Sequence, residues 1–404
     1  MPGPCSIRPD REFLGRILGE GGEDVKKCVQ CGTCSVVCDQ ANGGVPFPRK
    51  EMIWAQWGLK ARLVADPDIW LCFQCNDCTT RCPRGARPGD VLAALRRESV
   101  KHYAFPRFLG GWVNQLKALP LILLIPAVLL GLALAVKAPL EKALGLEGPA
   151  HGFYAGFFPH WLLIGFFSLF TGLTFLAAAA GVVRFWQAMK AADASSGRNT
   201  PALAILPGLV RTLKSILGHD KFGNCTSRTS RRWAHLAAFY GFTALFVVTV
   251  WAVIDLYVNP VLGIDAMYPF GPLHPMKILA NIGCVLLIFG CVKAIMDRLG
   301  SRETAGTSTS FDWIFVWLLL GVAVTGLLTE ILRFAADPGK HAAAAAERTP
   351  LQHVAFAVYF VHLVAVFDLL VYLPYSKFAH VLYRTVALVY AEHSGRGKGA
   401  FPKA

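Results

Sequence analysis

The sequence predicts an all-α protein in which a soluble N-terminal domain precedes a bundle of six membrane-spanning helices. Of its 404 residues, 54% are hydrophobic and only 16% are charged, whereas a soluble protein carries about 25% charged residues. The apolar residues gather in long blocks from Leu116 onward, and the sequence up to Tyr103 is mixed and polar. Eight of the twelve cysteines lie in that first part, in two compact groups. These features separate a cysteine-rich part from an apolar part.

The change in composition places the domain boundaries. We expect residues 1–110 to form a cytoplasmic domain, residues 111–390 a transmembrane domain, and residues 391–404 a short basic tail. The formal net charge of +14 invites a nucleic-acid interpretation. The basic residues, however, flank the apolar blocks, where they set membrane orientation, and they form no stripe with interleaved aromatic residues. We therefore expect a lipid bilayer and no nucleic acid as partner.

Both cysteine groups have the spacing C-x2-C-x2-C-x3-C. The runs are Cys28, Cys31, Cys34, Cys38 and Cys72, Cys75, Cys78, Cys82. This spacing is typical of bacterial ferredoxins with two [4Fe–4S] clusters, in which the fourth cysteine of each run binds the other cluster. Three thiolates on one tight turn reach three iron corners, and the fourth corner faces away. We therefore assign Cys28, Cys31, Cys34 and Cys82 to one cluster, and Cys72, Cys75, Cys78 and Cys38 to the other.

Structural zinc is the alternative interpretation of the cysteines, but zinc usually takes its four ligands from two separated CxxC pairs. Residues 1–27 contain no apolar segment of the kind found in signal peptides, so we expect this domain to stay in the reducing cytoplasm, where such cysteines bind metal. Between the runs, residues 52–60 favour helix over strand. The domain therefore resembles the α-helical two-cluster ferredoxin domain of succinate dehydrogenase-type iron–sulfur subunits.

Six apolar blocks are long enough to span a bilayer, which takes about 20 residues as a helix. They cover residues 117–136, 160–183, 233–257, 275–296, 312–332 and 354–373. With the N-terminal domain inside, the loops 184–232 and 297–310 are cytoplasmic and hold nine and two Lys+Arg. The outer loops hold one, none and two, as the positive-inside rule requires. We expect a multi-pass protein of the inner (cytoplasmic) membrane with its C-terminus in the cytoplasm.

Histidines at membrane depth predict b-type haem. His362 and His380 are 18 residues apart, which is five turns of one helix and about 27 Å of rise, less if Pro374 bends it. The two would serve two stacked haems, one toward each side of the membrane. His235 lies at the inner end of its span and is paired with His380. For His362, both His274 and His160 begin spans on the outer side, and His274 is slightly favoured because polar groups gather around it.

A membrane quinone is the expected electron acceptor or donor beyond the outer haem. Quinone chemistry takes up two electrons and two protons, so its site needs a proton-handling group. Lys277 and His274, at the outer end of the fourth span, are the candidates. The alternative is that the Lys277 side chain reaches to the membrane interface, as lysines near helix ends do.

The membrane part resembles known cytochromes b. Residues 360–364 and 373–380 look like the last span of the respiratory nitrate reductase gamma subunit, a family with two histidines there at the same separation. Residues 233–235 resemble the start of its haem-ligating second span, but Leu245 stands where that family has a further histidine. The resemblance therefore implies a cytochrome b-type bundle and leaves the fourth haem ligand open.

The N-terminal part resembles the C subunit of heterodisulfide reductase in both cysteine runs and in residues 48–50 and 68–70, and the membrane part resembles that enzyme's cytochrome E subunit. A fusion of the two looks like the C subunit of the quinone-interacting membrane-bound oxidoreductase (Qmo) complex. That resemblance implies Qmo-like A and B subunits as flavin and iron–sulfur partners, and adenylylsulfate (APS) reductase as redox partner.

These features predict an electron-transfer subunit of a quinone-linked oxidoreductase complex that is not a complete enzyme alone. One alternative is a membrane-tethered iron–sulfur redox sensor, although no output domain remains once the spans are assigned. Another is a heterodisulfide reductase-type or sulfite-reduction-linked electron-transfer subunit. An ion transporter with an accessory ferredoxin is disfavoured, because the repeats with broken helices that transporters often show are not visible.

Overall fold

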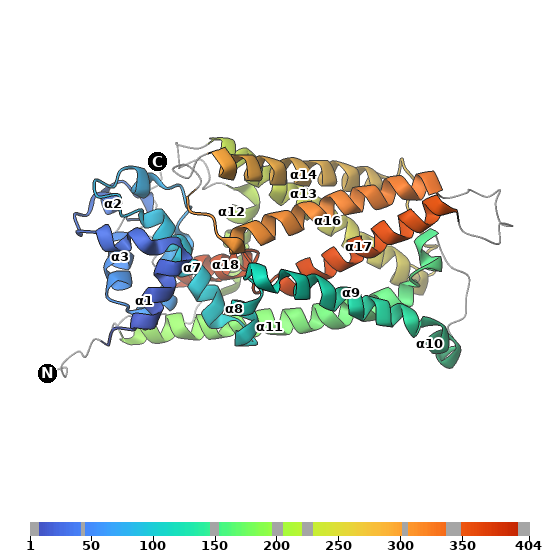
Figure 1. The fold of residues 1–404 in the computed structure, drawn as a ribbon, viewed down its shortest axis with the longest axis horizontal. Helices are drawn as coiled ribbons and strands as arrows, with labels where there is room; N and C mark the ends of the chain where they lie inside the picture. The colour runs from blue at the N-terminus through green and yellow to red at the C-terminus, as the bar shows by residue number, and fades with distance from the viewer. Residues whose placement is uncertain are drawn as a thin grey trace.

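The computed structural model describes residues 8–41, 45–145, 153–195, 205–219, 229–300, 306–336 and 349–394. The molecule is elongated, with a head of short helices at one end and a bundle of long helices extending from it (Figure 1). Every regular element in these residues is a helix, as the sequence predicts.

The head domain (residues 8–103) is built from short helices around one long one. They are α1 (Arg11–Ile17), α2 (Thr33–Val36), α3 (Arg49–Gln56), α4 (Lys60–Val64), α5 (Asp68–Leu71), α6 (Asp77–Thr80) and α7 (Pro88–Tyr103). The helix predicted between the cysteine runs is α3, which ends before Gly58. Gly58 has φ +63, and a Cβ there would lie 2.6 Å from the Asp10 carbonyl oxygen. Only glycine allows α1 and α3 to approach this closely.

The remaining helices form the bundle and its connections. They are α8 (Arg107–Trp112), α9 (Leu119–Ala135), α10 (Lys137–Leu144), α11 (His160–Ser195), α12 (Ile205–Gly218), α13 (Thr229–Tyr257), α14 (Pro275–Gly300), α16 (Ser310–Ala336), α17 (Pro350–Tyr372) and α18 (Ala379–His393). Six of the described helices are long and apolar enough to cross a membrane, namely α9, α11, α13, α14, α16 and α17. All six predicted blocks are therefore confirmed as helices of membrane-spanning length.

The head does not have a core of its own. Its buried cluster contains Phe13, Met52 and Trp70, but also Phe185 from the end of α11 and Tyr390 from α18. The helix α11 continues about eleven residues beyond the predicted end of its span, to Ala194, and this extension runs along the head (Figure 1). One hydrophobic core therefore joins the head to the adjacent end of the bundle.

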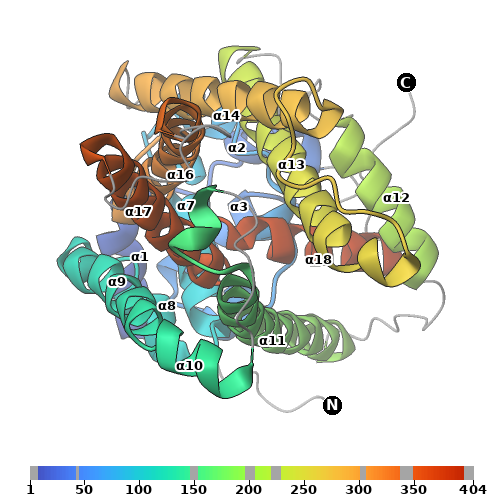
Figure 2. The same cartoon turned by 90° about the vertical axis from the view of Figure 1, so that its right-hand side faces the viewer.

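The prediction that His362 and His380 share one helix is wrong. The helix α17 ends at Tyr372, and α18 begins only at Ala379. Pro374 lies in the turn between them, where its ring cannot continue the helix. As a result α18 runs across the end of the bundle nearest the head and does not continue the direction of α17 (Figure 2). The separation of about 27 Å along one helix axis no longer applies.

A buried carboxylate fixes the head against the bundle. Asp312 lies in the first turn of α16. Its carboxylate forms an ion pair with the ammonium group of Lys377, which lies in the turn before α18 and donates a hydrogen bond to it. Its carboxylate also lies 3.6 Å from Arg97 of α7 and 3.8 Å from Arg298 of α14. The side chain of Asp312 is 6% exposed. Because a buried charge is costly unless it is paired, these contacts hold four parts of the chain in one arrangement.

Small residues let α13 and α14 approach closely over two turns. A Cβ at Gly241 would lie 2.6 Å from the Gly283 carbonyl oxygen, and one at Gly290 would lie 2.5 Å from the Ala238 amide nitrogen. Both obstacles are backbone atoms, which cannot rotate away. Helix pairs in membranes commonly pack through such small residues, because packing contacts are a main source of their stability.

We expect Gly290→Ala to destabilise the bundle by about 1–3 kcal/mol, because the added methyl group forces α13 and α14 apart. The matched control is Gly321→Ala, in the interior of α16, where nothing lies within 4 Å of the added Cβ. That change should be neutral or stabilising, since alanine favours helix over glycine. Thermal unfolding of the detergent-solubilised protein measures both. Equal effects of the two substitutions would contradict the packing.

Candidate iron–sulfur and haem sites

The two cysteine runs fold into loops with the same backbone conformation. Gln30 (φ 61) and Gln74 (φ 58), each just before the second cysteine of its run, are left-handed. So are Gly32 (φ 84) and Asn76 (φ 68), each just after it. A left-handed non-glycine residue costs about 1–2 kcal/mol, so this repeated pattern indicates a shared structural demand. The short helices α2 and α6 then follow the two loops.

The fourth cysteine of each run lies with the other run. A cavity is lined by the Cys38 side chain together with Cys72, Cys75 and Cys78. Burial, followed by the neighbouring Cys28 and Cys82 thiols, raises the pKa of Cys34 to about 11. The cavity therefore brings Cys38 to the second run, as crossed ligation requires, and the Cys82 thiol is close enough to Cys34 to affect its pKa; the full crossed assignment stays a prediction. Four thiols around one cavity fit a cubane cluster.

The first cysteines of the two runs differ in what binds their carbonyl oxygens. The Cys28 carbonyl accepts a hydrogen bond from the neutral Gln56 amide (2.9 Å). The Cys72 carbonyl instead accepts from two guanidinium groups, those of Arg96 (2.7 Å) and Arg384 (2.9 Å). Sequence reasoning missed both arginines. The one available signal was that Arg384 follows His380 by four residues, about one helical turn.

The two loops also differ in their surroundings. The first lies at the surface, where Cys31 is exposed and its neighbours Val29 and Val36 are 60% and 88% exposed. The second lies against the bundle, since Trp70, two residues before Cys72, stacks on Tyr383 of α18 with ring centroids 5.4 Å apart. The first loop is therefore open to a soluble partner, and the second adjoins the membrane part.

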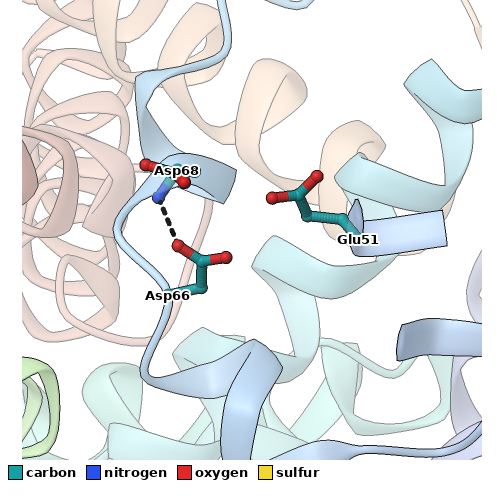
Figure 3. A group of neighbouring side chains, drawn as sticks. All are labelled: Glu51, Asp66 and Asp68. Carbon is teal, nitrogen blue, oxygen red and sulfur yellow. Dashed lines mark hydrogen bonds between the residues drawn. The ribbon is translucent and has the colours of Figure 1, made fainter. Parts of the chain in front are cut away.

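A buried acidic group lies beside the second loop. Glu51 on α3 points toward Asp66 and Asp68, and the Asp68 amide donates to Asp66 (Figure 3). The three carboxylates are close enough to hold a metal ion. However, the Lys50 ammonium lies 3.1, 2.8 and 2.7 Å from Glu51, Asp66 and Asp68 respectively. The Lys50 ammonium therefore occupies the position that a metal ion would take among the three carboxylates. Sequence reasoning missed this structural role of Lys50.

His380 has the geometry of a metal-binding imidazole. Its Nδ1 lies 2.6 Å from the Lys377 carbonyl oxygen. That contact suits a protonated Nδ1 and leaves Nε2 available, as in most metal-bound histidines. Burial lowers the pKa of His380 to about 4, so the ring is neutral at physiological pH, as a ligand must be.

His235, the predicted partner of His380, is exposed near the start of α13. Its ring lies 5.5 Å from that of His219, which follows α12, and it stacks on Phe239. Further along α13, Phe242 packs on Phe378 with ring centroids 5.0 Å apart, so α13 contacts the chain just before His380. The structure thus places His235 and His380 on neighbouring segments. His219 is a further histidine there that sequence reasoning missed.

The three histidines predicted for the outer haem lie on different segments: His362 on α17, His160 at the start of α11, and His274 just before α14. The Nδ1 atom of His362 is 3.0 Å from the Thr325 hydroxyl of α16, and the ring packs against Gly326 of the same helix. His160 contacts the Tyr268 ring, and His274 stacks on Phe270 with centroids 4.5 Å apart. These contacts favour neither His274 nor His160 as the partner of His362, so the choice between them stays a prediction.

Lys277, the predicted quinone-site residue, bridges two helices. Its ammonium lies 2.7 Å from Glu330 of α16, and Asn281 donates to the other oxygen of that carboxylate at 3.2 Å. The side chains of Lys277 and Glu330 are 19% and 16% exposed. Lys277 is therefore held in an ion pair between α14 and α16, which does not fit free extension to the membrane interface.

We expect Lys50→Met to destabilise the protein by about 3–5 kcal/mol, because three buried carboxyl groups lose their counter-ion. Burial raises the pKa of Glu51 and Asp66 in the folded state. Such groups lose stability as pH rises through the folded-state pKa, so the deficit should be larger at about pH 8 than at about pH 5. Thermal unfolding at both pH values measures it.

The control for this prediction is Lys27→Met, which breaks the Lys27–Asp24 pair (2.6 Å), in which the lysine side chain is 59% exposed. Exposed pairs contribute about 0–1 kcal/mol. A deficit in Lys50→Met that matched the control, or that shrank with rising pH, would contradict the assigned role of Lys50.

Comparison with known proteins supports iron–sulfur clusters in the head. A family model of the 4Fe-4S dicluster domain matches residues 24–86. The C subunit of the H(2):CoB-CoM heterodisulfide,ferredoxin reductase of Methanothermobacter marburgensis is 37% identical over 93 residues, which are 23% of this chain and 50% of that protein. A protein of Archaeoglobus profundus that is described as like the C subunit of heterodisulfide reductase is 40% identical over 85 residues, 21% of this chain and 45% of that protein.

A third relative extends over both parts of the chain. Citrate utilization protein B of Escherichia coli is 29% identical over 349 residues, which are 82% of this chain and 83% of that protein. No solved structure matches. The chain spans about half the length of the heterodisulfide reductase relatives it matches. It therefore carries a 4Fe-4S dicluster domain like that of heterodisulfide reductase C subunits, joined to a membrane-type helical part.

Proposed function

We propose that the chain is the membrane subunit of a respiratory oxidoreductase complex and transfers electrons between soluble flavin and iron–sulfur partners and the membrane quinone pool. One observation carries the proposal. The Cys72 loop and the helix that bears His380 pack into the same buried core, with Trp70 stacked on Tyr383. A cluster site therefore adjoins a candidate haem ligand across a continuous, tightly packed contact.

The chain's residues would hold each group as follows. Cys28, Cys31 and Cys34 with Cys82, and Cys72, Cys75 and Cys78 with Cys38, bind two [4Fe–4S] clusters. His380 and His235 bind the inner b-type haem, and His362 with His274 or His160 binds the outer one. When bound, these groups supply one-electron carriers. The Nδ1 contacts of His380 and His362 fix the orientation of both rings, which supports this assignment.

Quinone is the proposed substrate at the outer end of α14. Its reduction or oxidation moves two protons, and the Lys277–Glu330 pair provides one group that can give a proton and one that can accept it. Asn281 holds the carboxylate in place. His274, three residues before Lys277, is a second proton-handling group at the same end of α14.

The soluble partner would dock at the exposed first loop, around Cys31, Val29 and Val36. The resemblance to the C subunit of the Qmo complex supports Qmo-like A and B subunits as the flavin and iron–sulfur partners, with APS reductase as the ultimate redox partner. The head would then face the cytoplasm and the bundle would lie in the inner membrane.

The relative that covers both parts of the chain supports a second candidate. Because Citrate utilization protein B matches 82% of this chain, the same electron-transfer path could serve a system for using citrate or a similar organic acid. Copurification distinguishes the two candidates, since only the first predicts flavin-bearing A and B partners and electron exchange with APS reductase.

The proposal predicts the iron and haem content of the purified protein. We expect about eight iron atoms in clusters and two b-type haems per chain. Total iron, acid-labile sulfide and a pyridine haemochrome spectrum measure these numbers. Clusters without any haem would overturn the quinone-linked function and leave the redox-sensor alternative standing.

We expect His380→Leu to remove the inner haem and retain the outer one, because only one of its two imidazole ligands remains and leucine cannot bind iron. The matched control is His393→Leu, at the end of the same helix, where the ring packs against Trp186. That variant should keep the wild-type haem content. Loss of haem in the control, or none in His380→Leu, would contradict the ligand assignment.

A further inference from the structure

The two cysteine loops have the same backbone but differ in the charge placed at one equivalent atom. In the first loop, the carbonyl oxygen of the leading cysteine, Cys28, accepts from the neutral Gln56 side chain. In the second loop, the equivalent carbonyl of Cys72 accepts from Arg96 and Arg384, which both carry a full positive charge. The two cluster sites of one chain therefore differ at this carbonyl oxygen: a neutral donor binds it in the first loop, and two cationic donors bind it in the second.

The two arginines come from different parts of the molecule. Arg96 lies on α7 of the head and also donates to Ile69 (2.7 Å) and to the Gln74 side chain (3.0 Å). Arg384 lies on α18 and stands over the Phe73 ring at 5.1 Å. Arg96 is thus part of the internal structure of the head. Arg384 acts on the same carbonyl from the helix that carries His380.

Positive charge beside a cluster site favours the reduced form. One-electron reduction adds one negative charge, and nearby cations stabilise that charge. Reduction potentials of iron–sulfur clusters depend on net charge, hydrogen bonding and solvent exposure around the sulfur ligands. Because the Cys72 loop is shielded between head and bundle, the two guanidinium charges are less screened by water than they would be at the surface.

We propose that Arg384 is a positioning residue that raises the reduction potential of the cluster bound by Cys72, Cys75, Cys78 and Cys38. Through its hydrogen bond to the Cys72 carbonyl it also holds that loop at a set distance from His380, about one helical turn away on α18. This inference rests on the proposed function. One electron passes between this site and its two neighbours, the first cluster site and the inner haem site, and no proton or bond is exchanged.

The test is a redox titration of the full chain in detergent. The electron paramagnetic resonance signals of the reduced clusters monitor the reduction of each cluster. In Arg384→Gln we expect the reduction equilibrium of one cluster to become at least tenfold less favourable, which is about 59 mV for a one-electron couple. The other cluster should not shift. In Arg384→Lys the charge remains, so the potential should stay near that of the wild type.

The matched control is Gln56→Leu, which removes the neutral donor from the Cys28 carbonyl. It should leave the cluster affected by Arg384→Gln unshifted. If neither cluster shifts in Arg384→Gln, or if Arg384→Lys shifts the potential as far as glutamine does, the inference is overturned. Failure of the proposed function would be recognised separately, because the wild-type protein would then lack two reducible clusters or would lack haem.

Discussion

Asp312 is the point at which the two parts of the molecule are held together. Its carboxylate meets Lys377, Arg97 and Arg298, so the head, α14, α16 and the turn before α18 converge on one side chain. Such a buried anion is stable only while its partners remain in place. Arg97 in turn lies 3.2 Å from Glu20 of the head. The network of protein charges therefore sets the orientation of the head against the bundle.

The shared core explains why this orientation matters for function. Trp70 precedes the second cysteine loop, and it packs on Tyr383 and Phe185 from the bundle's own helices. A head with a separate core could tilt on a linker, as domains joined by small interfaces do. Here a tilt would open the hydrophobic core itself. Electron transfer between a cluster and a haem depends steeply on distance, so a rigid junction suits the proposed role.

The sequence predicts best what depends on local spacing or composition. The cysteine runs place three thiols on one turn whatever the surroundings, and the long apolar blocks become helices of membrane-spanning length because backbone groups in lipid must bond within the segment. The turn around Pro374 was harder to foresee, since proline often only kinks a membrane helix. The Lys50 group, His219 and Arg384 could not be recognised, because their roles depend on contacts between segments far apart in the chain.

Arg384 and Asp312 connect docking with redox tuning. The turn that Lys377 anchors to Asp312 leads directly into α18, and α18 carries both His380 and Arg384. A movement of this helix would therefore have two effects together. It would change the distance from His380 to the Cys72 loop, and it would move the Arg384 charge away from the Cys72 carbonyl. The first loop has no such link, because its carbonyl donor, Gln56, belongs to the head. Assembly of head and bundle would therefore tune only the cluster next to the membrane and leave the partner-facing cluster to respond to the soluble partner.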